Sequence, residues 1–202
     1  MNDVADHPSE RPRLTRRLTR RRAAGLLLSV VAVPLAAGYA LRDDGDGTDP
    51  DGAGPIPWAD GAPTGPKVGD RAPNVRLAAL AGGETTLADE MTAGRPVVLN
   101  VFATWCASCR AEMPILGAAH GVSATVLGID LREGPDRVQA LVDETGARYP
   151  ILLDRDGAVA RAYGATSLPT TCVVAPDGTI RRWIVGPVTA ESLADAIAAA
   201  TR

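Results

Sequence analysis

The apolar positions in the C-terminal two thirds of the chain fall into short runs that are separated by turn residues. The segments 96–102 and 124–131 are continuous apolar runs, which is typical of strands buried on both faces of a sheet. Other short runs predict further strands over 75–77, 85–87, 149–154, 170–175 and 179–185. The first two of these flank a Gly-Gly turn and predict a hairpin.

Apolar residues at helical spacing lie between these predicted strands. The spacing predicts helices over 106–117, 136–146 and 158–163, and Thr189 can cap a last helix. Strands that alternate with helices are typical of an α/β domain in which helices flank one sheet. We therefore expect one α/β domain over 67–202, a length that is sufficient for a single core.

The N-terminal pattern is different and predicts a membrane element. Seven arginines within the basic tail 1–22 precede an uncharged, mostly apolar run over 23–41. A helix of that length spans about 28 Å, close to the thickness of the hydrocarbon core of a bilayer. Arginines before the run and aspartates after it keep the tail in the cytoplasm. We expect a single-pass signal-anchor; the alternative is a cleaved signal peptide, with Gly38-Tyr39-Ala40 as its cleavage site, and both export the domain.

Residues 42–66 have the composition of a linker. Eleven of these 25 residues are Gly or Pro and six are Asp. Such a stretch buries too little apolar surface to offset the entropy of ordering it. We expect a disordered, semi-extended tether that holds the domain away from the bilayer.

Composition excludes several classes of function. The 24 acidic and 21 basic residues give a net charge of −3, which argues against a nucleic-acid partner because such a protein needs a positive face. Three cysteines are too few for a disulfide-stapled scaffold. Two histidines leave little material for a His-based metal site, and we expect neither a metal nor a cofactor.

The candidate chemistry lies at Cys106 and Cys109, at a predicted strand-to-helix turn. A thiolate at a helix N-terminus is stabilised by unpaired N–H groups and the helix dipole, so we expect a lowered pKa for Cys106. Cys106 would attack a partner disulfide, and Cys109 would then release the reduced partner. A zinc site would need two more ligands, with only Cys172 and His120 available, and a purely structural disulfide is the other alternative.

The segment 102–114 (FATWCASCRAEMP) resembles the active site of the thioredoxin superfamily, in particular its TlpA/ResA-like membrane-anchored extracytoplasmic thiol-disulfide oxidoreductases. Matching pieces occur at 68–73 (VGDRAP), 168–171 (LPTT) and 175–178 (APDG), so that the resemblance covers 67–201. It implies a thioredoxin fold, with a central mixed sheet flanked by helices and an extra N-terminal β-hairpin.

The resemblance implies roles for three further residues. Pro169 matches the cis-proline that faces the CxxC pair; the alternative is an ordinary trans loop proline. Glu112 matches an acid that exchanges a proton with Cys109; the alternative is a solvated charge paired with an arginine. Trp105 would cover the disulfide or simply pack. Asn100 departs from the buried Asp of thioredoxin, which shifts proton transfer to Glu112 or solvent.

The resemblance also implies a function. We expect reduction of protein disulfides outside the membrane, in apocytochrome c or copper-site cysteines, with electrons from a membrane thiol carrier. An exported disulfide oxidase of the same fold is the alternative. A copper metallochaperone would need a CxxxC and a later His, and a peroxiredoxin places Thr three residues before its Cys, whereas Thr104 is two before Cys106. We expect Cys172 to be a buried, inert thiol.

Overall fold

The computed structural model describes residues 54–56, 58 and 61–202. The basic tail expected over 1–22, the span expected over 23–41 and the first part of the linker expected over 42–66 lie outside these residues. No helix in the described part of the chain combines the length and the hydropathy of a membrane span.

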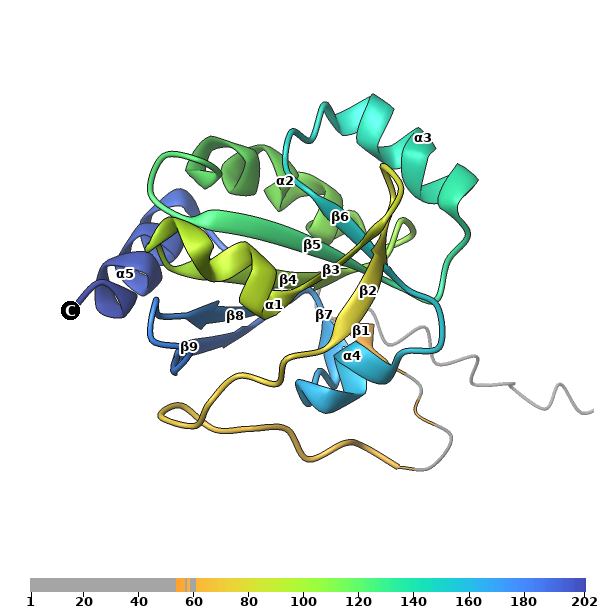
Figure 1. Ribbon diagram of the computed structural model, residues 1–202. Helices are drawn as coiled ribbons and strands as arrows, with labels where there is room; N and C mark the ends of the chain where they lie inside the picture. The colour runs from red at the N-terminus through yellow and green to blue at the C-terminus, as the bar shows by residue number, and fades with distance from the viewer. Residues whose placement is uncertain (1–53, 57, 59–60) are drawn as a thin grey trace, which may run out of the picture. The chain divides into compact units, whose positions relative to one another are not determined.

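A seven-stranded mixed sheet forms the centre of the domain (Figure 1). Its strands are β2 (Arg76–Ala79), β3 (Glu84–Thr86), β4 (Val97–Phe102), β5 (Thr125–Leu131), β6 (Ile151–Asp154), β8 (Thr170–Val174) and β9 (Ile180–Val185). They are ordered β3-β2-β6-β5-β4-β8-β9. β4 pairs in parallel with β5 and antiparallel with β8, and every residue of β4 is buried. The predicted central strand and the predicted N-terminal hairpin, β2–β3, are confirmed.

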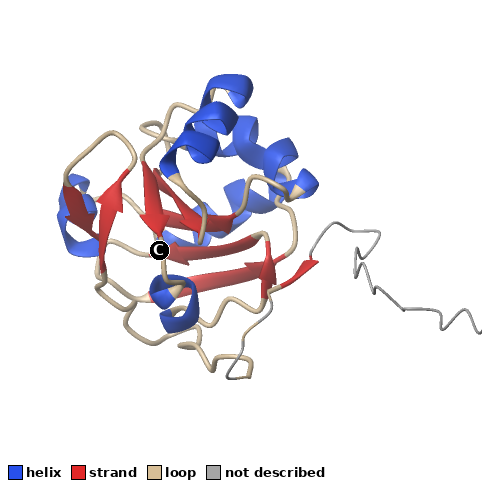
Figure 2. Cartoon of the chain, turned by 90° about the vertical axis from the view of Figure 1, so that its right-hand side faces the viewer, coloured by secondary structure: helices blue, strands red, loops and turns tan. Residues whose placement is uncertain are grey.

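Helices cover both faces of this sheet, as Figures 1 and 2 show. The helices are α1 (Leu87–Glu90), which runs into a 3-10 turn, η1 (Met91–Ala93), and then α2 (Ala107–Ala119), α3 (Pro135–Thr145), α4 (Ala158–Ala162) and α5 (Ala190–Ala200). α2 lies beside α3, and α2 and α5 together line an apolar groove of about 420 Å³. On the other face, Leu87 of α1 and Val159 of α4 line a small cavity together with strand residues such as Leu127. The α/β architecture predicted from the sequence is confirmed.

Two helix starts depend on capping side chains. Thr189 accepts a hydrogen bond from the Ser192 N–H and begins α5, as predicted. Thr86 accepts one from the Asp89 N–H in the same way, so the second hairpin strand ends at Thr86 and Leu87 already belongs to α1.

α2 runs two residues beyond the predicted end at Gly117, because its last turn closes with the His120 N–H on the Leu116 oxygen at 3.1 Å.

The described part of residues 42–66 contacts the domain, which corrects the expectation of a free linker there. β1 (Gly54–Pro55) pairs antiparallel with β7 (Ser167–Leu168), forming a small two-stranded sheet. Ile56 is buried, and the Trp58 Nε1–H donates to the Ala165 oxygen at 2.9 Å. The prediction was wrong here because it rested on the average composition of the segment. Two large apolar residues, Ile56 and Trp58, bury surface that holds this segment on the domain.

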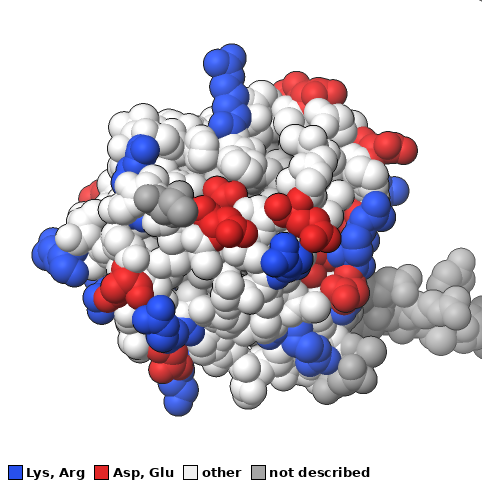
Figure 3. Space-filling view, in the orientation of Figure 1, with Lys and Arg blue, Asp and Glu red and all other residues white. Residues whose placement is uncertain are grey.

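Charges of both signs are spread over the described surface in Figure 3, with wide uncharged areas between them. The surface ion pairs of the described residues include half-buried Arg181 with Asp177 at 3.2 Å and exposed Arg76 with Glu84 at 3.8 Å. Exposed pairs of this kind contribute little stability. The face in Figure 3 thus offers no continuous basic patch of the kind that a polyanion would need.

Candidate active site

The cysteine pair lies where the central strand runs into a helix. β4 ends at Phe102, and the Cys106 N–H donates to the Ala103 oxygen at 3.2 Å, which tightens the turn between strand and helix. Cys106 is the N-cap of α2, and Cys109 lies in its first turn. The two sulfurs form a disulfide, with 5.3 Å between the Cα atoms. The structure therefore brings the two predicted redox residues together as the sequence predicts.

The two cysteine residues are both buried, but they differ in how completely they are enclosed and in their hydrogen bonds. The Cys106 residue is 5% exposed, whereas Cys109 is 0% exposed. The Cys109 N–H points at the Cys106 Sγ at 3.2 Å, and the Ser108 Oγ is 3.5 Å from the same sulfur. After reduction, these groups and the helix dipole favour a thiolate on Cys106. The geometry suits attack by Cys106 on an incoming sulfur and later attack by the enclosed Cys109.

Glu112 is a buried carboxyl group behind the pair, one turn beyond Cys109 on α2. Its Oε1 accepts from the Asn100 Nδ2 at 2.7 Å, and its Oε2 accepts from the Val188 N–H at 2.7 Å. Burial raises the pKa of Glu112 to about 7, against these two hydrogen bonds, which lower it. A solvated charge paired with an arginine is therefore excluded, and Glu112 can exchange a proton near neutral pH.

Asn100 explains how a carboxyl group can be held there. It lies in the buried strand β4 and donates to Glu112 and also to the Thr171 Oγ1 of β8 at 3.0 Å. An Asp at this position would bring a second negative charge against Glu112 in a low dielectric. The amide instead links strand and helix, and the shift of proton transfer away from position 100 stays a prediction.

The other residues predicted for the site have different surroundings. The Leu168-Pro169 peptide bond is cis, as predicted, and the pairing of Thr170 with Val101 places Pro169 beside the end of β4 from which the cysteine turn starts. Trp105 is 60% exposed, which excludes a core packing role; covering the disulfide stays a prediction. Cys172 is buried in β8, opposite Leu99, and burial raises the pKa of its thiol to about 12, as expected of an inert thiol.

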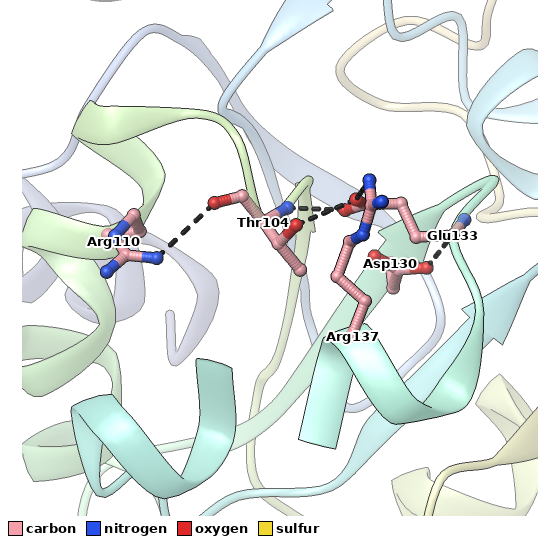
Figure 4. Close-up of polar contacts among 5 residues, drawn as sticks. All are labelled: Thr104, Arg110, Asp130, Glu133 and Arg137. Carbon is pink, nitrogen blue, oxygen red and sulfur yellow. Dashed lines mark hydrogen bonds and ion pairs between the residues drawn. The ribbon is translucent and has the colours of Figure 1, made fainter. Parts of the chain in front are cut away.

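A group of polar contacts, which we call the clamp, holds Thr104 in the cysteine turn (Figure 4), and the sequence analysis did not predict it. The Thr104 N–H and hydroxyl both donate to the Glu133 carboxylate, the hydroxyl at 2.7 Å. The Arg110 Nη1 donates to the Thr104 oxygen at 3.5 Å, and Arg137 pairs with Glu133 at 3.4 Å. Both peptide groups of a residue two positions before Cys106 are thereby fixed.

Asp130 holds the backbone of the clamp residue Glu133. It is fully buried at the end of β5, and its Oδ2 accepts from the Glu133 N–H at 3.1 Å. Burial, with the nearby charge of Glu133, raises the pKa of Asp130 to about 7. A signal was present in the sequence, because an acid inside a run predicted to be buried on both faces requires a polar partner.

The alternative ligands for zinc are engaged elsewhere. The His120 Nδ1 accepts from the Val126 N–H at 3.1 Å, and Cys172 is enclosed in the sheet. Among residues 54–56, 58 and 61–202, no three His, Cys, Asp or Glu side chains are grouped so that they could hold a metal ion.

Comparison with known proteins places the chain in a family. Residues 68–183, more than half of the chain, match the AhpC/TSA family. This chain belongs to the AhpC/TSA family.

The relatives carry thiol-disulfide exchange names. The chain is 32% identical to the thiol-disulfide oxidoreductase ResA of Geobacillus thermodenitrificans over 62% of this chain and 74% of that protein. It is 34% identical to the thiol:disulfide interchange protein DsbE of Escherichia coli over 56% and 63%. A solved secreted disulfide oxidoreductase of Mycobacterium tuberculosis, homologous to DsbE, superposes with a TM-score of 0.56 at 26% identity, over 62% and 96%. The chain is a thiol-disulfide oxidoreductase of the ResA/DsbE type with a thioredoxin fold.

The raised pKa of Glu112 predicts how stability depends on pH. An acid whose pKa is higher in the folded than in the unfolded protein stabilises the fold fully at a pH below the unfolded pKa. This contribution is lost as the pH rises through the folded pKa, here about 7. The loss amounts to about 3 kcal/mol, from a pKa of 4.5 to about 7. Glu112→Gln should therefore lose less free energy of unfolding between pH 5 and pH 8 than the wild type, as measured by urea denaturation. Asp130 titrates in both proteins, so equal losses would contradict the assignment to Glu112.

The clamp predicts a positioning role for Glu133. Glu133→Ala leaves the Thr104 N–H without its partner and should slow attack of Cys106 on a disulfide about tenfold or more, because small misplacements of a reacting atom are costly. Glu133→Gln keeps one acceptor oxygen and should recover part of the rate. Stopped-flow kinetics of the reduced protein, at several pH values, separates position from charge. The control is Glu84→Ala, which removes an exposed ion pair with Arg76 outside the clamp, and this variant should react like the wild type.

Proposed function

We propose that this protein reduces disulfides of other proteins outside the cytoplasmic membrane. The observation that carries the proposal is the asymmetry of the pair, with Cys106 at the helix N-terminus and Cys109 fully enclosed, one helical turn before the buried acid Glu112. One sulfur is suited to meet a partner and the other to finish the reaction inside the protein.

The proposed reaction has two exchange steps. The Cys106 thiolate attacks one sulfur of a substrate disulfide; the Cys106–substrate bond forms, the substrate S–S bond breaks, and the second substrate sulfur leaves as a thiolate. Cys109, once deprotonated, attacks the Cys106 Sγ, which restores the Cys106–Cys109 disulfide and releases the first substrate sulfur. Two electrons pass to the substrate, and a membrane thiol carrier would supply them again.

Glu112 is the proposed acceptor of the Cys109 proton. It follows Cys109 by one helical turn, is shielded from water, and its pKa of about 7 lets it accept a proton at neutral pH and return it later. The second exchange step should accordingly speed up as pH rises through about 7.

Two observations support the location. The basic tail and apolar run over 1–41 have the pattern of an exported or anchored protein, and one solved relative is a secreted oxidoreductase. With the names of the ResA and DsbE relatives, this favours a domain outside the membrane. Apocytochrome c or copper-site cysteines are the substrates that we propose.

The reduction potential of the Cys106–Cys109 pair tests the direction of electron flow. A reductase requires a potential below about −200 mV, measured by equilibration in glutathione or dithiothreitol buffers. A value well above about −200 mV would instead make the protein a disulfide oxidase.

A trapping variant tests the roles of the two cysteines and finds the substrate. Cys109→Ser should accumulate a mixed disulfide through Cys106, visible on non-reducing gels of membranes and identified by mass spectrometry. Cys172→Ser is the matched control and should trap nothing, because Cys109 is still present to release the substrate and the buried Cys172 takes no part in the exchange. Trapping that persists in a Cys106→Ser/Cys109→Ser double variant would refute the assignment.

A further inference from the structure

A segment that precedes the domain pairs with a strand next to the redox site. Gly54 lies opposite Leu168 and Pro55 opposite Ser167, and the Ile56 N–H donates to the Thr166 oxygen at 2.8 Å. β7 directly precedes the cis-proline Pro169 and is outside the main sheet. Within the described part of the chain, β1 is the strand that pairs with β7.

The side chains of this segment are seated in the domain. Ile56 is only 6% exposed, and the Trp58 indole N–H reaches the Ala165 oxygen at 2.9 Å. The guanidinium groups of Arg132 and Arg161 lie 4.6 and 5.1 Å from the centre of the Trp58 ring, as cation–π contacts. We call Gly54–Ile56 and Trp58 the strap.

The strap also borders the cysteine turn. A cavity of about 250 Å³ is lined by Ile56 of the strap and by Trp105, which directly precedes Cys106. The rest of its lining comes from the end of β5 and the clamp: Leu131, Arg132, Glu133 and Arg137. A single groove therefore contains an apolar position, an exposed tryptophan and charged groups of both signs, next to the reactive sulfur.

Extended peptides bind to proteins by adding a strand to a free edge, with pockets that take alternate side chains. A protein disulfide has to approach Cys106 on a stretch of extended chain, and the groove beside β7 provides such an edge once the strap is absent. We propose that the strap occupies the peptide-binding groove of this domain, and that a protein substrate binds by replacing it. The substrate segment would pair with β7 and place an aliphatic side chain where Ile56 now lies. The identity of the occupant as a redox substrate rests on the proposed function.

The strap is built to be replaceable. β1 has two residues, and its Pro55 has no N–H to donate, so few backbone hydrogen bonds hold it. The chain is fixed independently further on, where Gly65 crosses Gly164 so closely that a Cβ on Gly65 would lie 2.5 Å from the Tyr163 oxygen. Release of the strap would leave that crossing in place.

Kinetics of the full-length protein test the proposal. Ile56→Asp/Trp58→Ala should lower the KM for a disulfide-bonded protein such as insulin about tenfold, since a competing occupant is lost, with kcat unchanged. The rate with glutathione disulfide, which is too small to need the groove, should stay the same. The control Val122→Asp, at a 78% exposed position, should change neither constant. An unchanged KM in the double variant would overturn the proposal.

A binding measurement keeps this test separate from the proposed function. A fluorescein-labelled peptide of residues 52–60 should bind the double variant and restore the wild-type KM. The same peptide should bind the wild type at least tenfold more weakly, because the tethered strap acts at a high effective concentration. Equal binding to both proteins, or no binding to the variant while circular dichroism shows it folded, would contradict the strap. If the peptide binds as expected but the wild type exchanges no disulfide, the proposed function fails and the groove stands.

Discussion

The turn between β4 and α2 has to hold two sulfurs at the end of a helix in one fixed geometry, and the rest of the domain supplies the restraints. β4 is buried along its whole length between β5 and β8, so the starting point of the turn cannot shift. Glu133 and Arg110 hold the peptide groups of Thr104 from opposite sides. The helix N-terminus can then act on Cys106 because the chain enters it at a set angle.

A buried carboxyl group is the main electrostatic cost of this arrangement. Glu112 loses hydration, and hydrogen bonds from the Asn100 side chain and from the Val188 N–H compensate for part of this loss. These contacts come from β4 and from the loop before α5, so the acid ties the active-site helix to two separate parts of the domain. The partial compensation leaves its pKa near 7, where a proton carrier works best at neutral pH.

The parts of this structure that follow from short-range patterns could be predicted from the sequence. The buried strands, the capping of α5 by Thr189, the cysteine turn and the burial of Cys172 each depend on neighbouring residues or on a resemblance in register. The strap could not be predicted, because Trp58 meets Ala165 across 107 positions and its segment has the average composition of a linker. The contact of Thr104 with Glu133 was missed for the same reason, although Asp130, an acid inside an apolar run, marked the region as unusual.

The strap and the cysteine turn meet in one short piece of backbone. Arg132 adopts a φ of 63°, in the left-handed region that residues with a side chain rarely occupy. Its side chain contacts the Trp58 ring. The next residue, Glu133, accepts the Thr104 N–H, and the Asp130 carboxylate accepts the Glu133 N–H. A substrate that replaces the strap removes the Trp58 contact from Arg132. Arg132, whose backbone lies in this strained region, thus contacts the strap and directly precedes Glu133 of the clamp, so that one short segment after β5 borders both the groove and the cysteine turn.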